Sequence, residues 1–141
     1  LNDNYDLQNS HVLPALIRKF HMAKITSAPF VTLWGTGSPK REFLYVDDLA
    51  NACLHLMKHY DEKQFLNIGT GEDLTIHELA ELIKSIVGYD GEIIWDINKP
   101  DGTPRKLMDV SKVHALGWKH DVSLEEGIKK TYLNFLTLDL A

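Results

Sequence analysis

Cysteine is almost absent from this sequence, and its scarcity excludes an internal disulfide. The single Cys53 suits a reducing compartment, so we expect a cytoplasmic protein. No run of apolar residues among the 141 is long enough for a membrane-spanning helix. Basic residues are fewer than acidic ones, fifteen against twenty, and the formal net charge of −5 argues against nucleic-acid and membrane-surface partners.

The glycine pattern of a dinucleotide site is also missing. That site needs G-x-G-x-x-G between a strand and a helix, so that backbone N–H groups can approach the pyrophosphate. Two fragments come near, Gly35-Thr36-Gly37 and Gly69-Thr70-Gly71, but Lys40 and Leu74 stand where the third glycine belongs. No Tyr-x-x-x-Lys pair is present either. We therefore interpret both fragments as turns that follow strands, and expect no redox machinery within these residues.

The hydrophobic periodicity predicts short strands that alternate with helices. This order is typical of an α/β fold, and without an obvious linker we expect one compact unit. Helices are expected over 10–24, 47–60, 75–88, 111–117 and 123–135, and strands over 30–34, 42–46, 65–68 and 93–95.

Several polar residues are expected to cap these helices. Thr75 with Glu78, and Ser123 with Glu126, have capping-box spacing, while Asp47 or Asp48 and Ser111 are expected to cap two others. The helix over 47–60 is expected to carry one apolar face made of Leu49, Ala52, Cys53, Leu56, Met57 and Tyr60.

A histidine pair is the only metal-like pattern that we find. His55 and His59 are four residues apart on a predicted helix, a spacing that allows two imidazoles to share a zinc ion. No third ligand is suggested nearby, so a pair on the helix surface is the favoured explanation, and we expect no metal site.

Two basic doublets and one histidine are candidates for binding and chemistry. Lys40-Arg41 and Arg105-Lys106 lie in predicted loops, where they either clamp a diphosphate together or are simply exposed. His11 precedes the first helix, where it either transfers protons near neutral pH or hydrogen-bonds at the helix entry. Spacing alone favours the simpler explanation in each case.

Longer stretches resemble a known family. Residues 41–50 (REFLYVDDLA), 66–71 (LNIGTG), 116–118 (LGW) and 123–128 (SLEEGI) are similar to the C-terminal halves of extended short-chain dehydrogenase/reductases that act on nucleotide sugars. Three further stretches give a more specific match within this family: residues 9–21, 31–37 and 99–106. They resemble those members that epimerise C3 and C5 of a GDP-linked 4-keto-6-deoxy-D-mannose and reduce its C4 with NADPH.

The resemblance implies roles for particular residues. His11 matches a catalytic histidine that also lies beside the nicotinamide of NADP, and its cysteine partner is expected in a preceding domain rather than at Cys53. The positions that match substrate-binding residues are Lys19, Trp34, Arg41, Asp101 and Lys106. Lys19 stands where some relatives have arginine, and Arg105 is expected beside the site.

The same resemblance implies a domain organisation. Residues 1–141 are expected to form the α/β lobe that binds the GDP-sugar, while the NADP-binding Rossmann domain is expected to precede this lobe and to be absent from the chain. The intact enzyme is expected to be a homodimer, and this lobe alone to be inactive. Two other interpretations stay open: a related nucleotide-sugar epimerase or reductase, and a non-catalytic nucleotide-sugar binding module.

Overall fold

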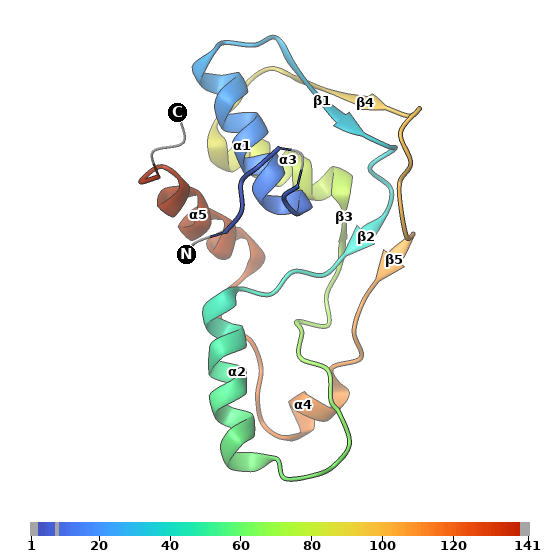
Figure 1. The fold of residues 1–141 in the computed structure, drawn as a ribbon, viewed down its shortest axis with the longest axis vertical. Helices are drawn as coiled ribbons and strands as arrows, with labels where there is room; N and C mark the ends of the chain where they lie inside the picture. The colour runs from blue at the N-terminus through green and yellow to red at the C-terminus, as the bar shows by residue number, and fades with distance from the viewer. Residues whose placement is uncertain (1–2, 8, 139–141) are drawn as a thin grey trace.

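Three helices and a pair of parallel strands build the larger part of the protein (Figure 1). The computed structural model describes residues 3–7 and 9–138. Strands β1 and β4 pair in parallel along their full length. None of the helices in these residues is long and apolar enough to cross a membrane. The elements are α1 (Val12–Ile25), β1 (Phe30–Trp34), α3 (Ile76–Val87), β4 (Glu92–Asp96) and α5 (Leu124–Phe135).

The main core lies between these helices and the two strands. Leu16, Ile17 and Phe20 recur at helical spacing on α1 and are buried against the inward face of α3. Alternation along β1 buries Val31 and Leu33 and leaves the residues between them exposed. The α/β class and these five elements are therefore as predicted.

A second, smaller core lies at the other end of the molecule (Figure 1). It gathers Ala52, Val113 and Trp118 from α2 (Val46–His59), α4 (Ser111–Ala115) and the chain that follows α4. A three-stranded sheet joins the two ends, with β2 in its centre. Its strands are β2 (Lys40–Arg41), β3 (Leu74–Thr75) and β5 (Arg105–Lys106).

Two of the predicted strands are wrong. Residues 42–45 leave the sheet after β2 and lead directly into α2. Residues 65–68 are irregular, because Leu66 and Ile68 pack against the second core while Phe65 is 88% exposed. No strand in the described part of the chain pairs with this segment. Alternating apolar residues indicate that one side of a segment is buried, but they do not show that a second strand lies beside it to form hydrogen bonds.

The predicted caps hold at two helices and fail at two. Thr75 caps α3 in a complete capping box with Glu78, and Ser123 accepts a hydrogen bond from the backbone N–H of Glu126. The N-cap of α2 is Tyr45 rather than an aspartate, and the N-cap of α4 is Val110 rather than Ser111.

Asp48 has a different task from the predicted cap. Its side chain is buried within the first turn of α2 and accepts a hydrogen bond from the backbone N–H of Val122, at 3.0 Å. This contact ties α2 to the segment that precedes α5.

Helix α2 has two apolar faces instead of the predicted single one. Ala52 and Leu56 pack against the second core. Cys53, predicted on that face, is exposed, and so is Met57 at 82%. The outward stripe follows helical spacing and consists of Val46, Ala50, Cys53, Leu54 and Met57.

We predict that Thr75→Ala lowers the free energy of unfolding by about 1 kcal/mol, because the first turn of α3 loses its cap. Urea denaturation followed by circular dichroism measures this. Ser85→Ala is the matched control, since Ser85 is exposed on the same helix, and we expect a change within about 0.5 kcal/mol. Equal effects of the two substitutions would contradict the capping role.

Candidate functional site

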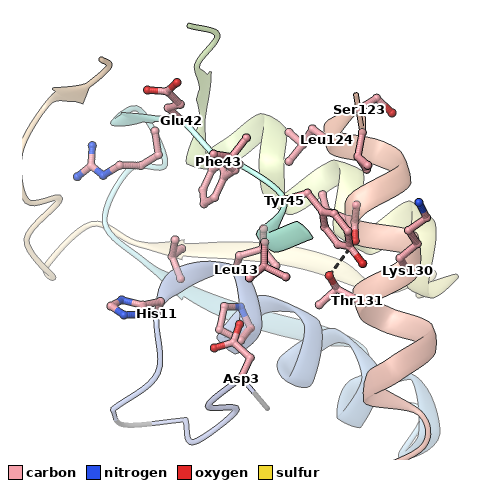
Figure 2. A pocket seen from close by; sticks show the side chains of 18 of the residues that line it. Asp3, His11, Leu13, Glu42, Phe43, Tyr45, Ser123, Leu124, Lys130 and Thr131 are labelled. Atoms are coloured by element: carbon pink, nitrogen blue, oxygen red, sulfur yellow. Dashed lines mark hydrogen bonds between the residues drawn. The ribbon is translucent and has the colours of Figure 1, made fainter. Parts of the chain in front are cut away.

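A cavity of about 880 Å³ opens between the start of α1, the segment that leaves β2, and α5. Figure 2 shows His11 at one end of this cavity and Lys130 and Thr131 of α5 at the other. The polar and charged residues in its wall include His11, Arg41, Glu42, Tyr45, Lys106 and Lys130. Three of the six predicted site residues, His11, Arg41 and Lys106, therefore line a single cavity.

Arg41 and Lys106 are neighbours because of the sheet register. Strands β2 and β5 pair in parallel with Arg41 opposite Lys106. Paired residues of adjacent strands project from the same side of a sheet, so both cations face the cavity. The neighbouring Arg105 faces Asp73 instead and forms an ion pair with it, which lowers the pKa of the Asp73 carboxyl. Of this doublet, only Lys106 lines the cavity.

The Glu42 carboxylate fixes the segments that carry these cations. One oxygen, Oε1, accepts hydrogen bonds from the backbone N–H groups of Thr70 and Gly71, and the other, Oε2, accepts one from Met108 at 2.9 Å. Hydrogen bonds from backbone N–H groups to a carboxylate are charge-assisted and stronger than those to a neutral acceptor, so they hold these segments firmly together. Glu42 thus joins the chain after β2 to the Gly69–Gly71 turn and to the chain after β5.

His11 occupies the N-cap position of α1, but its side chain makes no capping hydrogen bond. Its backbone carbonyl accepts the N–H of Ala15 instead. The imidazole is exposed at the cavity end, away from α5 (Figure 2). Hydrogen bonding at the helix entry, the simpler explanation offered by the sequence, therefore does not account for this side chain.

The other three predicted site residues lie together at the carboxyl ends of β1 and β4. Trp34 is the last residue of β1 and is 66% exposed. The ammonium nitrogen of Lys19 lies 6.0 Å from the centre of its ring, and that of Lys99 lies 5.5 Å from it. Lys19 is half-buried, and this desolvation lowers its pKa.

Asp101 holds the loop after β4 against the turn after β1. Its Oδ1 accepts a hydrogen bond from the backbone N–H of Thr36 at 2.6 Å, and its Oδ2 accepts one from the Thr36 hydroxyl at 2.8 Å. These bonds stabilise the carboxylate and lower the pKa of Asp101. The two loops leave adjacent parallel strands, the usual place for a binding site in α/β folds.

The six residues thus form two groups along one surface. The first is His11, Arg41 and Lys106 in the cavity, and the second is Lys19, Trp34 and Asp101 at the strand ends. The loop of residues 97–104 connects them, because a side chain added at Gly102 would meet Arg41 Nη2 at 3.9 Å. A ligand that spans both groups needs an anionic part for the cations and a flat part for Trp34.

Both Gly-Thr-Gly turns are filled by carboxylates of this chain. Glu42 takes the N–H groups of Thr70 and Gly71, and a Cβ at Gly69 would collide with its Oε1. Asp101 takes the N–H of Thr36, and a Cβ at Gly35 would collide with its Oδ1. The N–H groups of Thr36, Thr70 and Gly71 are thus taken by carboxylates rather than offered to a pyrophosphate, so these turns do not fit a dinucleotide. The prediction of a turn after a strand is confirmed for residues 35–37, which follow β1, but is wrong for residues 69–71, which follow no strand.

The remaining candidates are occupied by structural contacts. Lys130 lines the cavity but is paired with Glu126 at 2.8 Å. His55 Nε2 lies 2.8 Å from the Leu116 carbonyl oxygen, and its ring is tilted by 39° against that of His59, with centroids 4.5 Å apart. No cluster of three or more potential ligands for a metal ion occurs in residues 3–7 and 9–138.

The sequence analysis missed Glu42, Thr36 and Lys99. A signal for the first two is present, since a Gly-Thr-Gly turn offers a concave set of N–H groups that an acidic side chain can fill. For Lys99 there is none, because its place beside Trp34 depends on how two loops meet.

The chain is similar to known proteins over most of its length. The sequence pattern of the NAD dependent epimerase/dehydratase family matches residues 2–69. A probable GDP-L-fucose synthase 1 of Oryza sativa is 58% identical over 92% of this chain, and the GDP-L-fucose synthase of Escherichia coli is 50% identical over 96%. The chain is homologous to GDP-L-fucose synthases. It spans 40% and 45% of the length of these two relatives.

Solved structures agree with the fold as well. A GDP-L-fucose synthetase from Naegleria fowleri bound to NADP superimposes with a TM-score of 0.88 at 29% identity, over 95% of this chain and 42% of that one. A GDP-6-OMe-4-keto-L-xylo-heptose reductase from Campylobacter jejuni gives 0.88 at 37% identity, over 96% of this chain and 50% of that one. The fold therefore resembles the matching part of these epimerase/reductase structures.

We predict that Glu42→Gln lowers the free energy of unfolding by about 2 kcal/mol, because an amide cannot accept hydrogen bonds on both of its heavy atoms. Urea denaturation measures the loss. Glu72→Gln is the matched control, since Glu72 is exposed in the same turn and its hydrogen bonds use its backbone. A Glu42→Gln variant as stable as this control would contradict the proposed tie.

Proposed function

We propose that residues 1–141 form the GDP-sugar-binding domain of a GDP-L-fucose synthase. Such an enzyme converts GDP-4-keto-6-deoxy-D-mannose to GDP-L-fucose by epimerisation at C3 and C5 and reduction of the C4 ketone with NADPH. The observation that carries the proposal is the meeting of Arg41, Lys106 and His11 in one cavity of a chain homologous to these enzymes.

The cations supply the binding part of this proposal. Arg41 and Lys106 lie side by side and hold the diphosphate through charge-assisted hydrogen bonds, Arg41 with two parallel N–H groups and Lys106 as a point charge. Trp34 and Lys19 take the nucleotide at the ends of β1 and β4. The loop of residues 97–104 lies between the two groups, so one extended nucleotide sugar reaches both.

His11 supplies the proton transfer. Epimerisation next to a ketone requires removal of a proton from C3 or C5, which leaves an enolate, and return of a proton to the other face. An exposed imidazole at the cavity end, free of a capping bond, is suited to one side of this exchange. A cysteine in another domain supplies the other side, and Cys53, exposed on α2, does not.

NADP is held mainly by a domain outside residues 1–141. This accords with the two Gly-Thr-Gly turns, where carboxylates of this chain take the N–H groups of Thr36, Thr70 and Gly71, and with relatives more than twice as long. The bound cofactor supplies the hydride, and His11 contacts it from this side. The outward apolar stripe of α2 also accords with a further domain or a second subunit, because an exposed apolar helix face is typical of a protein–protein interface. The intact enzyme is proposed to be a cytoplasmic homodimer, and this domain alone to be inactive.

Another GDP-linked 4-keto sugar is the second candidate substrate. It is favoured by the Campylobacter jejuni heptose reductase, which is similar over 96% of this chain. The cationic pair and Trp34 would serve either substrate equally, since they face the nucleotide rather than the sugar.

We predict that the chain binds GDP more tightly than UDP, as measured by isothermal titration calorimetry. Arg41→Gln should weaken GDP binding by about tenfold, because one charge-assisted contact is lost. Lys130→Gln is the matched control, since this lysine lines the same cavity but is paired with Glu126, and we expect less than about a twofold change. Equal affinity for GDP and UDP would contradict the proposed substrate class.

We predict that His11→Gln in the intact enzyme slows exchange of the C3 and C5 protons with solvent by about a hundredfold or more. Incorporation of deuterium into the sugar, followed by NMR, measures the rate. GDP affinity should stay within a few-fold of the unchanged enzyme, because the imidazole faces the sugar. Exchange at the normal rate would rule out the catalytic role.

A further inference from the structure

We propose that Lys99 is a further nucleotide-binding residue of this site, and that Asp101 is a positioning residue that holds Lys99 beside Trp34 through Thr36. This inference rests on the proposed function and adds to it a second cation at the Trp34 end. It also gives Asp101 a role different from the direct substrate contact that the resemblance implies.

The position of Lys99 relative to Trp34 supports its role in nucleotide binding. Its ammonium nitrogen lies closer to the ring centre than that of Lys19, at 5.5 Å against 6.0 Å. Neither lysine has a carboxylate partner among the described residues, where the ion pairs use other lysines and Arg105. The Lys19 ammonium donates a hydrogen bond to the Thr32 carbonyl oxygen at 3.4 Å, which leaves its charge in place. Two ammonium groups without a carboxylate partner, beside an exposed indole, offer a flat surface for a nucleobase and positive charge for its phosphates.

The loop that carries Lys99 is held from both sides. Before it, the carbonyl oxygen of Asp96 accepts the N–H groups of Gly35 and Lys99, at 3.0 and 3.1 Å. After it, Asp101 accepts two hydrogen bonds from Thr36. Lys99 thus lies in a short span whose two ends are tied to the turn after Trp34, which limits where its side chain can reach.

The same contacts explain why Asp101 is a positioning residue. Both of its oxygens already accept hydrogen bonds from Thr36, and Oδ1 fills the space beside Gly35. A carboxylate would also repel the phosphates of a nucleotide. Its effect on binding therefore passes through the loop that it holds.

Calorimetric titration of the chain with GDP tests the first part. Lys99→Gln should weaken binding by roughly fivefold to tenfold, the effect of one charge-assisted contact. Lys58→Gln makes the same change of charge on the exposed side of α2 and should leave the affinity unchanged. Unchanged affinity of the Lys99→Gln variant would overturn this inference alone. Failure of the unchanged chain to bind GDP would overturn the proposed function, and this inference with it.

A double-variant comparison tests the second part. Asp101→Ala and Thr36→Val should each weaken GDP binding, the second by less, because it removes the hydroxyl bond to Asp101 and keeps the backbone N–H bond. Their combination should be no weaker than Asp101→Ala alone, because the Thr36 hydroxyl is expected to act through the same carboxylate. Thr36→Ser keeps the hydroxyl and should retain the affinity of the unchanged chain. If Asp101 contacted the nucleotide directly, Asp101→Ala would weaken binding while Thr36→Val alone left the affinity unchanged, which would overturn the positioning role.

Discussion

The hydrogen bonds to the Glu42 carboxylate are the constraint on which the rest of this structure depends. Each strand of the three-stranded sheet is only two residues long, which is too short to fix the register of the sheet by itself. Glu42 adds bonds to Thr70, Gly71 and Met108, so the chain segments after β2 and β5 and the turn before β3 are tied at one point. Arg41 and Lys106 meet because their strands end at this point.

A second carboxylate uses the same arrangement at the other end of the site. Asp101 fills the first Gly-Thr-Gly turn as Glu42 fills the second, and in each case the central threonine donates both its N–H and its hydroxyl. Turns of this kind can bind a phosphate, but here each binds an acidic side chain from a distant segment. These hydrogen bonds have a structural role. Glu42 ties together the segments that follow Arg41 in β2 and Lys106 in β5, and Asp101 holds the loop that carries Lys99.

The charge of the site is decided by which basic residues are left without a carboxylate partner. Arg105, Lys129 and Lys130 are paired with carboxylates, whereas Lys19 and Lys99 contact the Trp34 ring. The chain as a whole is acidic, yet the surface from Trp34 to His11 carries unpaired positive charge. The net charge of −5 therefore says nothing of this local field.

The sequence by itself determined the elements whose signals are local: the amphipathic helices α1, α3 and α5, the strands β1 and β4, and the capping box at Thr75. It also indicated His11, Arg41 and Lys106 through resemblance. Only the tertiary structure decided that residues 42–45 and 65–68 are not strands, that α2 has an outward apolar stripe, and that Lys99 lies beside Trp34. These features depend on hydrogen-bonding and packing partners far away in the chain, which periodicity within one segment cannot encode.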